Sequence, residues 1–194
     1  MTGSNWGKGF TVLIVTLSLM AARPATAQEA TEDRPETSAS VSVAAPIAPR
    51  DPGRGAVTNL PLPRYVSLKT GEGNARRGPG RTHRIDWVFN RAGMPLRITA
   101  EHENWRRVED SEGAGGWVHY SLLSGVRSVL VAEDMVMFRS QPDDAASEVL
   151  QAERGVIARL LECQPDWCRL GIDGSKGWVR KTALWGVDPG EEVE

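Results

Sequence analysis

From about residue 64 onward, the chain alternates between short apolar runs and clusters of Gly, Pro, Asn and Asp. Residues 96–101 alternate most clearly, which places Leu96, Ile98 and Ala100 on the inner face of a strand. No segment after the first 60 residues has the period of an amphipathic helix. Short strands separated by turn-forming residues predict an all-β fold.

The same pattern occurs twice, with an offset of about 62 residues. The matching segments are 76–79 with 139–142, 103–105 with 165–167, 116–118 with 177–179, and 123–125 with 184–186. A fixed internal repeat indicates a duplicated structural unit, and we expect the two units over 64–125 and 126–188. A unit of roughly 60 residues has little interior for a buried catalytic centre.

Length differences between the repeats fall in expected loops. The first repeat has one extra residue in the hairpin tip at 110–115, where the second has Asp173-Gly174. Asp-Gly predicts a two-residue turn, because glycine tolerates the positive φ that such a turn requires.

The first 27 residues have the features of an export signal. Lys8 precedes an apolar run over 10–22 that is short for a membrane span, and Ala25-Thr26-Ala27 has the small side chains that a signal peptidase requires. We predict cleavage after Ala27 and a periplasmic or secreted protein with no stable membrane span after processing. An uncleaved membrane-anchoring segment is the alternative.

Residues 28–60 are rich in Ala, Pro, Ser, Thr and Glu and contain few bulky apolar side chains. Such a segment buries too little apolar surface to offset its conformational entropy, so we expect a disordered tether.

The charge balance argues against nucleic acid as a partner. Removing residues 1–27 leaves 21 basic against 25 acidic residues, a net charge of −4 and no basic stripe. Five arginines do cluster near His83, at positions 76, 77, 81, 84 and 91. This segment is either a solvated loop or an anion-facing loop.

Two cysteines, Cys163 and Cys168, flank a four-residue turn over 164–167. Residues that flank a tight turn face each other across two strands, so we predict a structural disulfide. A redox pair is the alternative, but the spacing is not Cys-x-x-C, and two thiols alone make a poor zinc site. The first repeat has Glu101 and Arg106 at these positions, which predicts an ion pair there.

The segments 74–79, 103–105, 116–118 and 122–125 together resemble the bacterial SH3 domain family, and the resemblance covers about residues 64–187. It implies two tandem SH3-like five-stranded β-barrels after a disordered N-terminal segment. In exported tandem members the second copy carries Cys-x4-Cys and ends in Leu-Trp-Gly, here residues 184–186. The second repeat departs from the family motif at Gln141 and at Met137-Phe138.

The sequence offers no catalytic, cofactor or metal motif: its three histidines, at 83, 102 and 119, have unrelated spacings. Four tryptophans at equivalent positions (105 and 167, 117 and 178) are expected to fill the barrels. Trp87 and Trp185 have no aromatic counterpart, which favours a binding face or an interface between repeats. The expected ligand-binding residues are Trp87, Arg76, Arg77, Arg84 and Tyr120.

The resemblance implies a non-catalytic cell-envelope binding module that recognises peptidoglycan or its stem peptides. A periplasmic adaptor that docks a partner protein in a groove or on a sheet edge is the alternative. An unrecognised hydrolase is a third, less favoured hypothesis. The first repeat keeps the fuller motif and the arginines, so we expect it to bind ligand and the second to give support.

Overall fold

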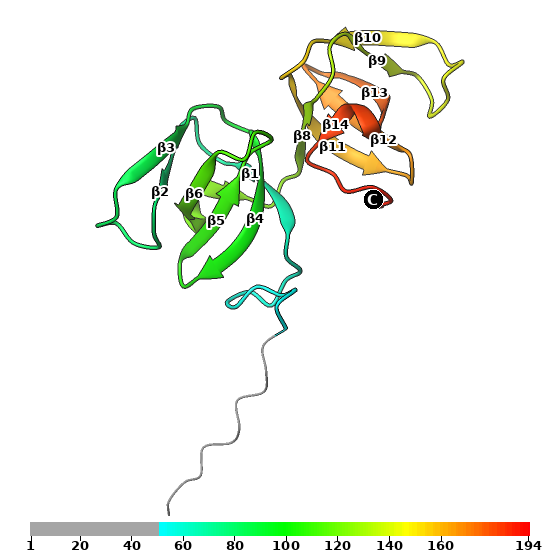
Figure 1. Cartoon of the computed structure of the whole chain (residues 1–194). Helices are drawn as coiled ribbons and strands as arrows, with labels where there is room; N and C mark the ends of the chain where they lie inside the picture. The colour runs from blue at the N-terminus through cyan, green and yellow to red at the C-terminus, as the bar shows by residue number, and fades with distance from the viewer. Residues whose placement is uncertain (1–50) are drawn as a thin grey trace, which may run out of the picture. The chain divides into compact units, whose positions relative to one another are not determined.

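The computed structural model describes residues 51–194. The predicted signal peptide (1–27) and residues 28–50 of the predicted tether lie outside the described residues. The described part forms two β-barrels, one for each sequence repeat (Figure 1), as the all-β prediction required. Within it, no helix is long and apolar enough to cross a membrane.

The first barrel is one antiparallel sheet in the order β3-β2-β6-β5-β4-β1-β7. A single turn of 3-10 helix, η1, leads from β6 into the last strand. The elements are β1 (Arg64–Leu68), β2 (Gly73–Arg76), β3 (Ile85–Phe89), β4 (Pro95–His102), β5 (Trp105–Glu109), β6 (Gly115–His119), η1 (Tyr120–Leu122) and β7 (Leu123–Ser124).

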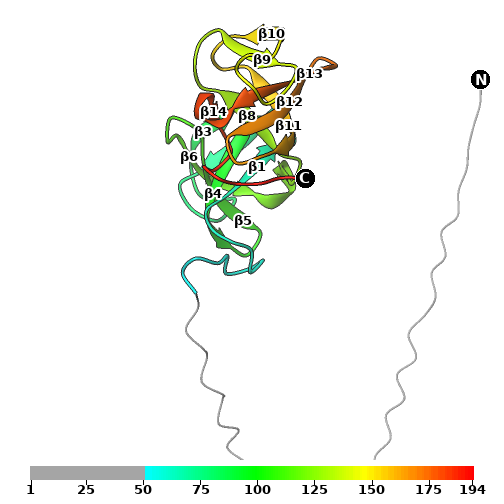
Figure 2. The ribbon, with the colours of Figure 1, turned by 90° about the vertical axis from the view of Figure 1, so that its right-hand side faces the viewer.

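The second barrel, whose strands β8 to β14 are labelled in Figure 2, repeats this order as β10-β9-β13-β12-β11-β8-β14. The elements are β8 (Ser128–Val131), β9 (Val136–Arg139), β10 (Glu148–Ala152), β11 (Ile157–Cys163), β12 (Trp167–Ile172), β13 (Ser175–Arg180), η2 (Lys181–Ala183) and β14 (Leu184–Trp185).

Each sheet has seven strands, two more than the five that we expected. The sequence pattern does not reveal β7 and β14, because a two-residue strand is too short to alternate. The strands β3 and β10 lie at the opposite edge of each sheet, where each bonds to one neighbour alone.

The two barrels share the same strand register at the repeated Gly-Trp motif. Trp117 pairs with Arg76 in the first barrel, and Trp178 pairs with Arg139 in the second. A Cβ at Gly116 would lie 2.6 Å from the Arg76 carbonyl oxygen, and a Cβ at Gly177 would lie 2.8 Å from the Phe138 Cβ. The motif therefore contains glycine because the crossing strand approaches too closely for a side chain.

Each barrel has its own apolar core. The first consists of Leu68, Ala75, Phe89, Leu96, Ile98, Val108 and Val118. The second is larger and includes Val129, Val131, Phe138, Ala158, Leu160, Leu170 and Val179. Both clusters consist mainly of inward-facing strand residues, as alternation predicts.

A β-bulge in β4 corrects one expectation of the sequence pattern. Leu96 and Ile98 are buried as predicted, but the register shifts between Ile98 and Ala100. Ala100 is half-buried, and the next residue, Glu101, takes the inward position. A bulge adds one residue to a strand, so it exchanges the faces of the residues that follow.

The second barrel has the equivalent bulge in β11, between Leu160 and Glu162, and the cysteines follow it. Cys163 and Cys168 are directly opposed, with Cα atoms 4.1 Å apart, and form the predicted disulfide. Both side chains are buried. The two bulges thus place the Glu101–Arg106 pair and the disulfide at equivalent points.

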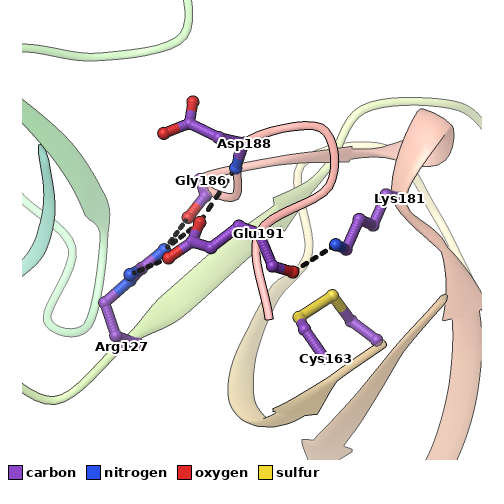
Figure 3. Close-up of a disulfide and its surroundings, with 7 residues drawn as sticks. Arg127, Cys163, Lys181, Gly186, Asp188 and Glu191 are labelled. Carbon is purple, nitrogen blue, oxygen red and sulfur yellow. Dashed lines mark hydrogen bonds and ion pairs between the residues drawn. A yellow bond between two sulfur atoms is a disulfide. The ribbon is translucent and has the colours of Figure 1, made fainter. Parts of the chain in front are cut away.

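The end of the chain covers the disulfide (Figure 3). Cys163 and Val193 exchange both backbone hydrogen bonds, at 2.8 and 3.1 Å. The Glu191 carboxylate accepts two hydrogen bonds from the Arg127 guanidinium, at 2.7 and 3.2 Å, and the Lys181 ammonium donates to the Glu191 carbonyl oxygen. Residues 187–194 are therefore part of the second barrel.

Removing the disulfide is expected to cost about 2 kcal/mol of unfolding free energy, the chain-entropy value for so short a loop. The variant Cys163→Ala/Cys168→Ala should unfold at lower urea concentration than the unreduced wild type. A reductant should lower the midpoint of the wild type and leave that of the variant unchanged. A wild-type midpoint that does not respond to reductant would contradict this prediction.

The Asp173-Gly174 turn forms as the sequence predicts. Both residues have positive φ, +47° and +86°, and Ile172 pairs with Ser175 around them. The two-residue turn thus joins β12 to β13 without a break in the ladder.

Three contacts join residues of the first barrel to residues of the second. The Tyr65 and Trp185 rings meet edge to face, with centroids 5.4 Å apart. The Ser128 hydroxyl donates to the Gly93 carbonyl oxygen at 2.6 Å, and Arg91 donates to the Gly155 carbonyl oxygen at 2.9 Å. Trp185, which has no aromatic counterpart in the first repeat, therefore contacts the other barrel.

Candidate functional site

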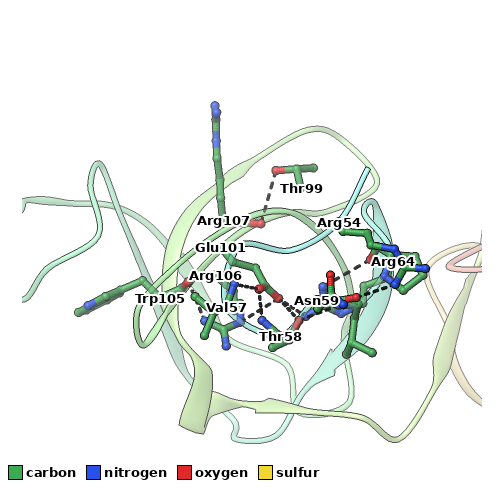
Figure 4. Close-up of polar contacts among 12 residues, drawn as sticks. Arg54, Val57, Thr58, Asn59, Arg64, Thr99, Glu101, Trp105, Arg106 and Arg107 are labelled. Carbon is green, nitrogen blue, oxygen red and sulfur yellow. Dashed lines mark hydrogen bonds and ion pairs between the residues drawn. The ribbon is translucent and has the colours of Figure 1, made fainter. Parts of the chain in front are cut away.

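A buried carboxylate, Glu101, holds the segment before the first barrel (Figure 4). Its side chain has no exposed surface. The Val57 and Thr58 amides donate to Oε2 at 2.9 and 2.8 Å, and the Thr58 hydroxyl donates to Oε1 at 2.6 Å. Residues 51–60, the last part of the expected tether, thus include backbone that bonds directly to the barrel.

Two arginines complete this Glu101 cluster. Arg64 lies 2.6 Å from Oε1, and Arg106 lies 3.5 Å from the same oxygen, so the predicted Glu101–Arg106 ion pair is present. Burial alone would raise the pKa of Glu101, but the hydrogen bonds from Thr58, Arg64 and Val57 outweigh it and lower the pKa to about 2. Because these bonds occupy the carboxylate within the protein, the cluster is structural and offers no place for a ligand.

A groove in the first barrel has the features of a binding site, and we call it the first groove. It has a volume of about 370 Å³. It is lined by Asn74, Arg76, Arg81, Trp105, His119, Ser121 and Leu122.

Three strands and one loop supply these side chains. Asn74 and Arg76 alternate along β2, and Arg81 comes from the loop between β2 and β3. Trp105, at the start of β5, pairs in register with His119, at the end of β6. Their rings meet edge to face, with centroids 5.5 Å apart.

Hydrogen bonds fix two of the polar side chains of the first groove. His119 Nδ1 lies 2.7 Å from the Ser121 hydroxyl oxygen. Arg76 donates to the His83 carbonyl oxygen at 2.6 Å, which uses one nitrogen of its guanidinium. The remaining N–H groups of Arg76 stay available to a ligand, because an arginine carries five.

The first groove is positively charged. It contains Arg76 and Arg81, its lining includes no acidic residue, and neither arginine forms an ion pair with another described residue. The nearby Asp86 carboxylate instead pairs with Arg77 at 3.0 Å and Arg84 at 2.7 Å. Hydrogen bonds from Arg77 and Arg84 lower the pKa of Asp86, so it stays ionised.

The structure separates the five residues that we expected to bind ligand. Arg76 lines the first groove, whereas Arg77 and Arg84 pair with Asp86. Trp87 lies on the edge strand β3 with 45% of its surface exposed, and it does not line the groove. Tyr120 is exposed beside His119, with ring centroids 5.0 Å apart.

Of the five expected ligand-binding residues, Arg76 alone lines the first groove, and the sequence pattern did not indicate its two aromatic residues, Trp105 and His119. The repeat predicts Trp105 in the barrel core, yet its side chain is only half-buried and points away from the Glu101 cluster (Figure 4). The spacing of the histidines gives no sign that His119 lines a groove. The strand register could have revealed both, because Trp105 and His119 are opposed across the β5–β6 hairpin.

Metal binding finds no support in the described part of the chain. Among residues 51–194, no three His, Cys, Asp or Glu side chains are grouped so as to hold a metal ion.

Comparison with known proteins gives one informative match. A family model described as "Bacterial SH3 domain" matches residues 69–125 and 132–186, which are the two barrels. No curated protein matches the chain.

Solved structures of NlpC2 and NlpC1 from Trichomonas vaginalis are similar at 14% and 13% identity, with TM-scores of 0.30 and 0.31. The alignments cover 63% and 68% of this chain and 48% of each of those chains, so the chain spans about half their length. TM-scores this low support no conclusion about fold or function.

Proposed function

The chain belongs to the bacterial SH3 domain family, and from that premise we propose that it is a non-catalytic binding module of the cell envelope. We propose that its first barrel recognises peptidoglycan or its stem peptides through the first groove. Bacterial SH3 domains are generally non-catalytic binding modules and commonly bind cell-wall components.

One observation carries this proposal: Arg76 and Arg81 lie beside the Trp105 indole in a groove with no acidic residue. Guanidinium groups bind carboxylates through paired hydrogen bonds, and an indole face packs on sugar or peptide. Stem peptides present free carboxylates on a sugar polymer, so they match both features. Tyr120, exposed next to His119, would extend the contact at the rim.

The proposal includes export. The family often occurs in exported or cell-envelope proteins. Cleavage after Ala27 remains a prediction, because that position lies outside the described residues.

A pelleting experiment with purified wall sacculi tests the proposal. The wild-type protein is expected to pellet with the sacculi, and Arg76→Ser/Arg81→Ser should weaken binding by about tenfold, because each arginine makes charge-assisted hydrogen bonds. The variant Arg107→Ser/Arg159→Ser is the matched control, since it removes the same charge from exposed strand positions outside the groove. Wild-type protein that stays in the supernatant would refute wall binding.

The edge strand β3 favours the second candidate function, a periplasmic adaptor. Ile85, Trp87 and Val88 are each 40–45% exposed on a strand that bonds to β2 alone. An exposed apolar edge can accept a strand from a partner protein. Trp87→Ala distinguishes the two functions, because wall pelleting through the first groove should not change, whereas docking on β3 should weaken.

A further inference from the structure

The second barrel has a groove at the position equivalent to the first groove, and we call it the second groove. It has a volume of about 280 Å³. Trp167 pairs with Arg180 across β12 and β13, as Trp105 pairs with His119 across β5 and β6. Arg180 therefore takes the place of His119.

The Arg180 guanidinium occupies the second groove in the way that the guanidinium of a bound ligand would. Its guanidinium carbon is 4.6 Å from the centroid of the Trp167 ring. Its Nε donates to one oxygen of Asp144 at 2.9 Å, and a terminal nitrogen donates to the other oxygen. An aromatic face and a two-pronged carboxylate together form a complete guanidinium site.

The charge of the second groove is opposite to that of the first. Three acidic residues, Glu133, Asp134 and Asp144, line it. Its other arginine, Arg139, donates to the Ala146 carbonyl oxygen at 2.9 Å and lies 3.8 Å from Glu148. Hydrogen bonding by Arg180 lowers the pKa of Asp144, so this carboxylate is ionised near neutral pH.

A ligand can displace Arg180 from its ion pair with Asp144. The side chains of Arg180 and Asp144 are 47% and 64% exposed. Exposed ion pairs contribute little to stability, because water screens them and long side chains lose entropy in forming them. A ligand can therefore replace Arg180 without disturbing the core.

We propose that the second groove binds an arginine side chain of a partner protein, with Trp167 and Asp144 as its contacts and Arg180 as the internal competitor. This inference goes beyond wall recognition and uses different residues. It also revises the expectation that the second barrel gives support alone.

The test compares the wild-type chain with Arg180→Ser, in which the competitor is removed. The probe is N-acetyl-arginine methylamide, and its neutral isostere, N-acetyl-citrulline methylamide, is the control ligand. Binding is followed by the NMR shift of the Trp167 indole N–H, which a Trp167→Phe variant identifies. Arg159→Ser, on an exposed strand position, is the control for loss of charge.

Arg180→Ser should bind the arginine probe about 5- to 30-fold more tightly than the wild type. The substitution makes the Asp144 carboxylate available for an ion pair and the Trp167 ring available for a cation–π contact. Adding Asp144→Asn should abolish the gain, and the citrulline probe should show none. The proposal is overturned if folded Arg180→Ser binds the arginine probe no more tightly than the wild type, or binds citrulline equally well. Sacculus pelleting depends on the first groove, so either proposal can fail without the other.

Discussion

Replacing Glu101 with glutamine is expected to lower the free energy of unfolding by about 3–5 kcal/mol, the usual effect of removing one partner from a buried ion pair. Four groups donate hydrogen bonds to the wild-type carboxylate, and among the described residues it has no neighbour that needs a donor in return. They are the Val57 and Thr58 amides, the Thr58 hydroxyl and Arg64. A glutamine would turn an NH2 group toward some of these donors, which leaves them buried and unsatisfied. Urea unfolding at pH 7 measures the loss.

Glu109→Gln is the matched control. Glu109 also pairs with an arginine, Arg97, but both side chains are partly exposed, so its replacement should cost no more than about 1 kcal/mol. Equal losses for the two variants would show that the burial of Glu101 has no energetic consequence.

The stabilisation by Glu101 should depend on pH. Its pKa is about 2 in the folded protein against an ordinary 4.5. The contribution is therefore fully present above about pH 4.5 and is lost as the pH falls toward 2. At about 1.4 kcal/mol for each pKa unit, a shift from 4.5 to about 2 corresponds to a total contribution of about 3.5 kcal/mol. The difference in stability between the wild type and Glu101→Gln should shrink over the same range, as urea unfolding at pH 7, 4 and 2.5 would show.

Phe138→Ala is expected to destabilise the second barrel by about 3–5 kcal/mol, through lost apolar burial and the cavity left behind. Phe138 is fully buried on β9 and belongs to the core of that barrel. A Cβ added at Gly177 would lie only 2.8 Å from the Phe138 Cβ, so the neighbouring strand β13 packs closely against Phe138. Denaturant unfolding followed by near-UV circular dichroism measures the effect.

Val149→Ala is the control for this prediction, because Val149 lies on the neighbouring strand β10 with 47% of its surface exposed. Its effect should stay within about 0.5 kcal/mol, as is usual for surface substitutions. A loss below about 1 kcal/mol for Phe138→Ala would mean that the core tolerates the cavity.

The sequence predicted those features that depend on local pattern or on the repeat. Leu96 and Ile98 alternate into the core, Asp173-Gly174 forms its turn, and Cys163 bonds to Cys168. The repeat also allowed the Glu101–Arg106 pair to be predicted from its cysteine counterpart. Such features need only neighbouring residues in one hairpin.

Features that depend on distant residues were missed. Composition placed residues 51–60 in the tether, because it counts apolar side chains and not the backbone amides that bind Glu101. The bulge after Ile98 reversed the face of Ala100, and nothing in the alternation marks a bulge. Trp87 stays a predicted ligand contact outside the first groove, which forms where β2, β5 and β6 meet, a point that only the sheet order defines.

The shared register of Trp105 with His119 and of Trp167 with Arg180 has an evolutionary consequence. After a gene duplication, the residue at this one cross-strand position can change in each copy without altering a core residue. In the second copy such a change can switch access to the Trp167 face on or off, while the charge of the groove is set by other residues. Access of a ligand is thereby uncoupled from folding stability.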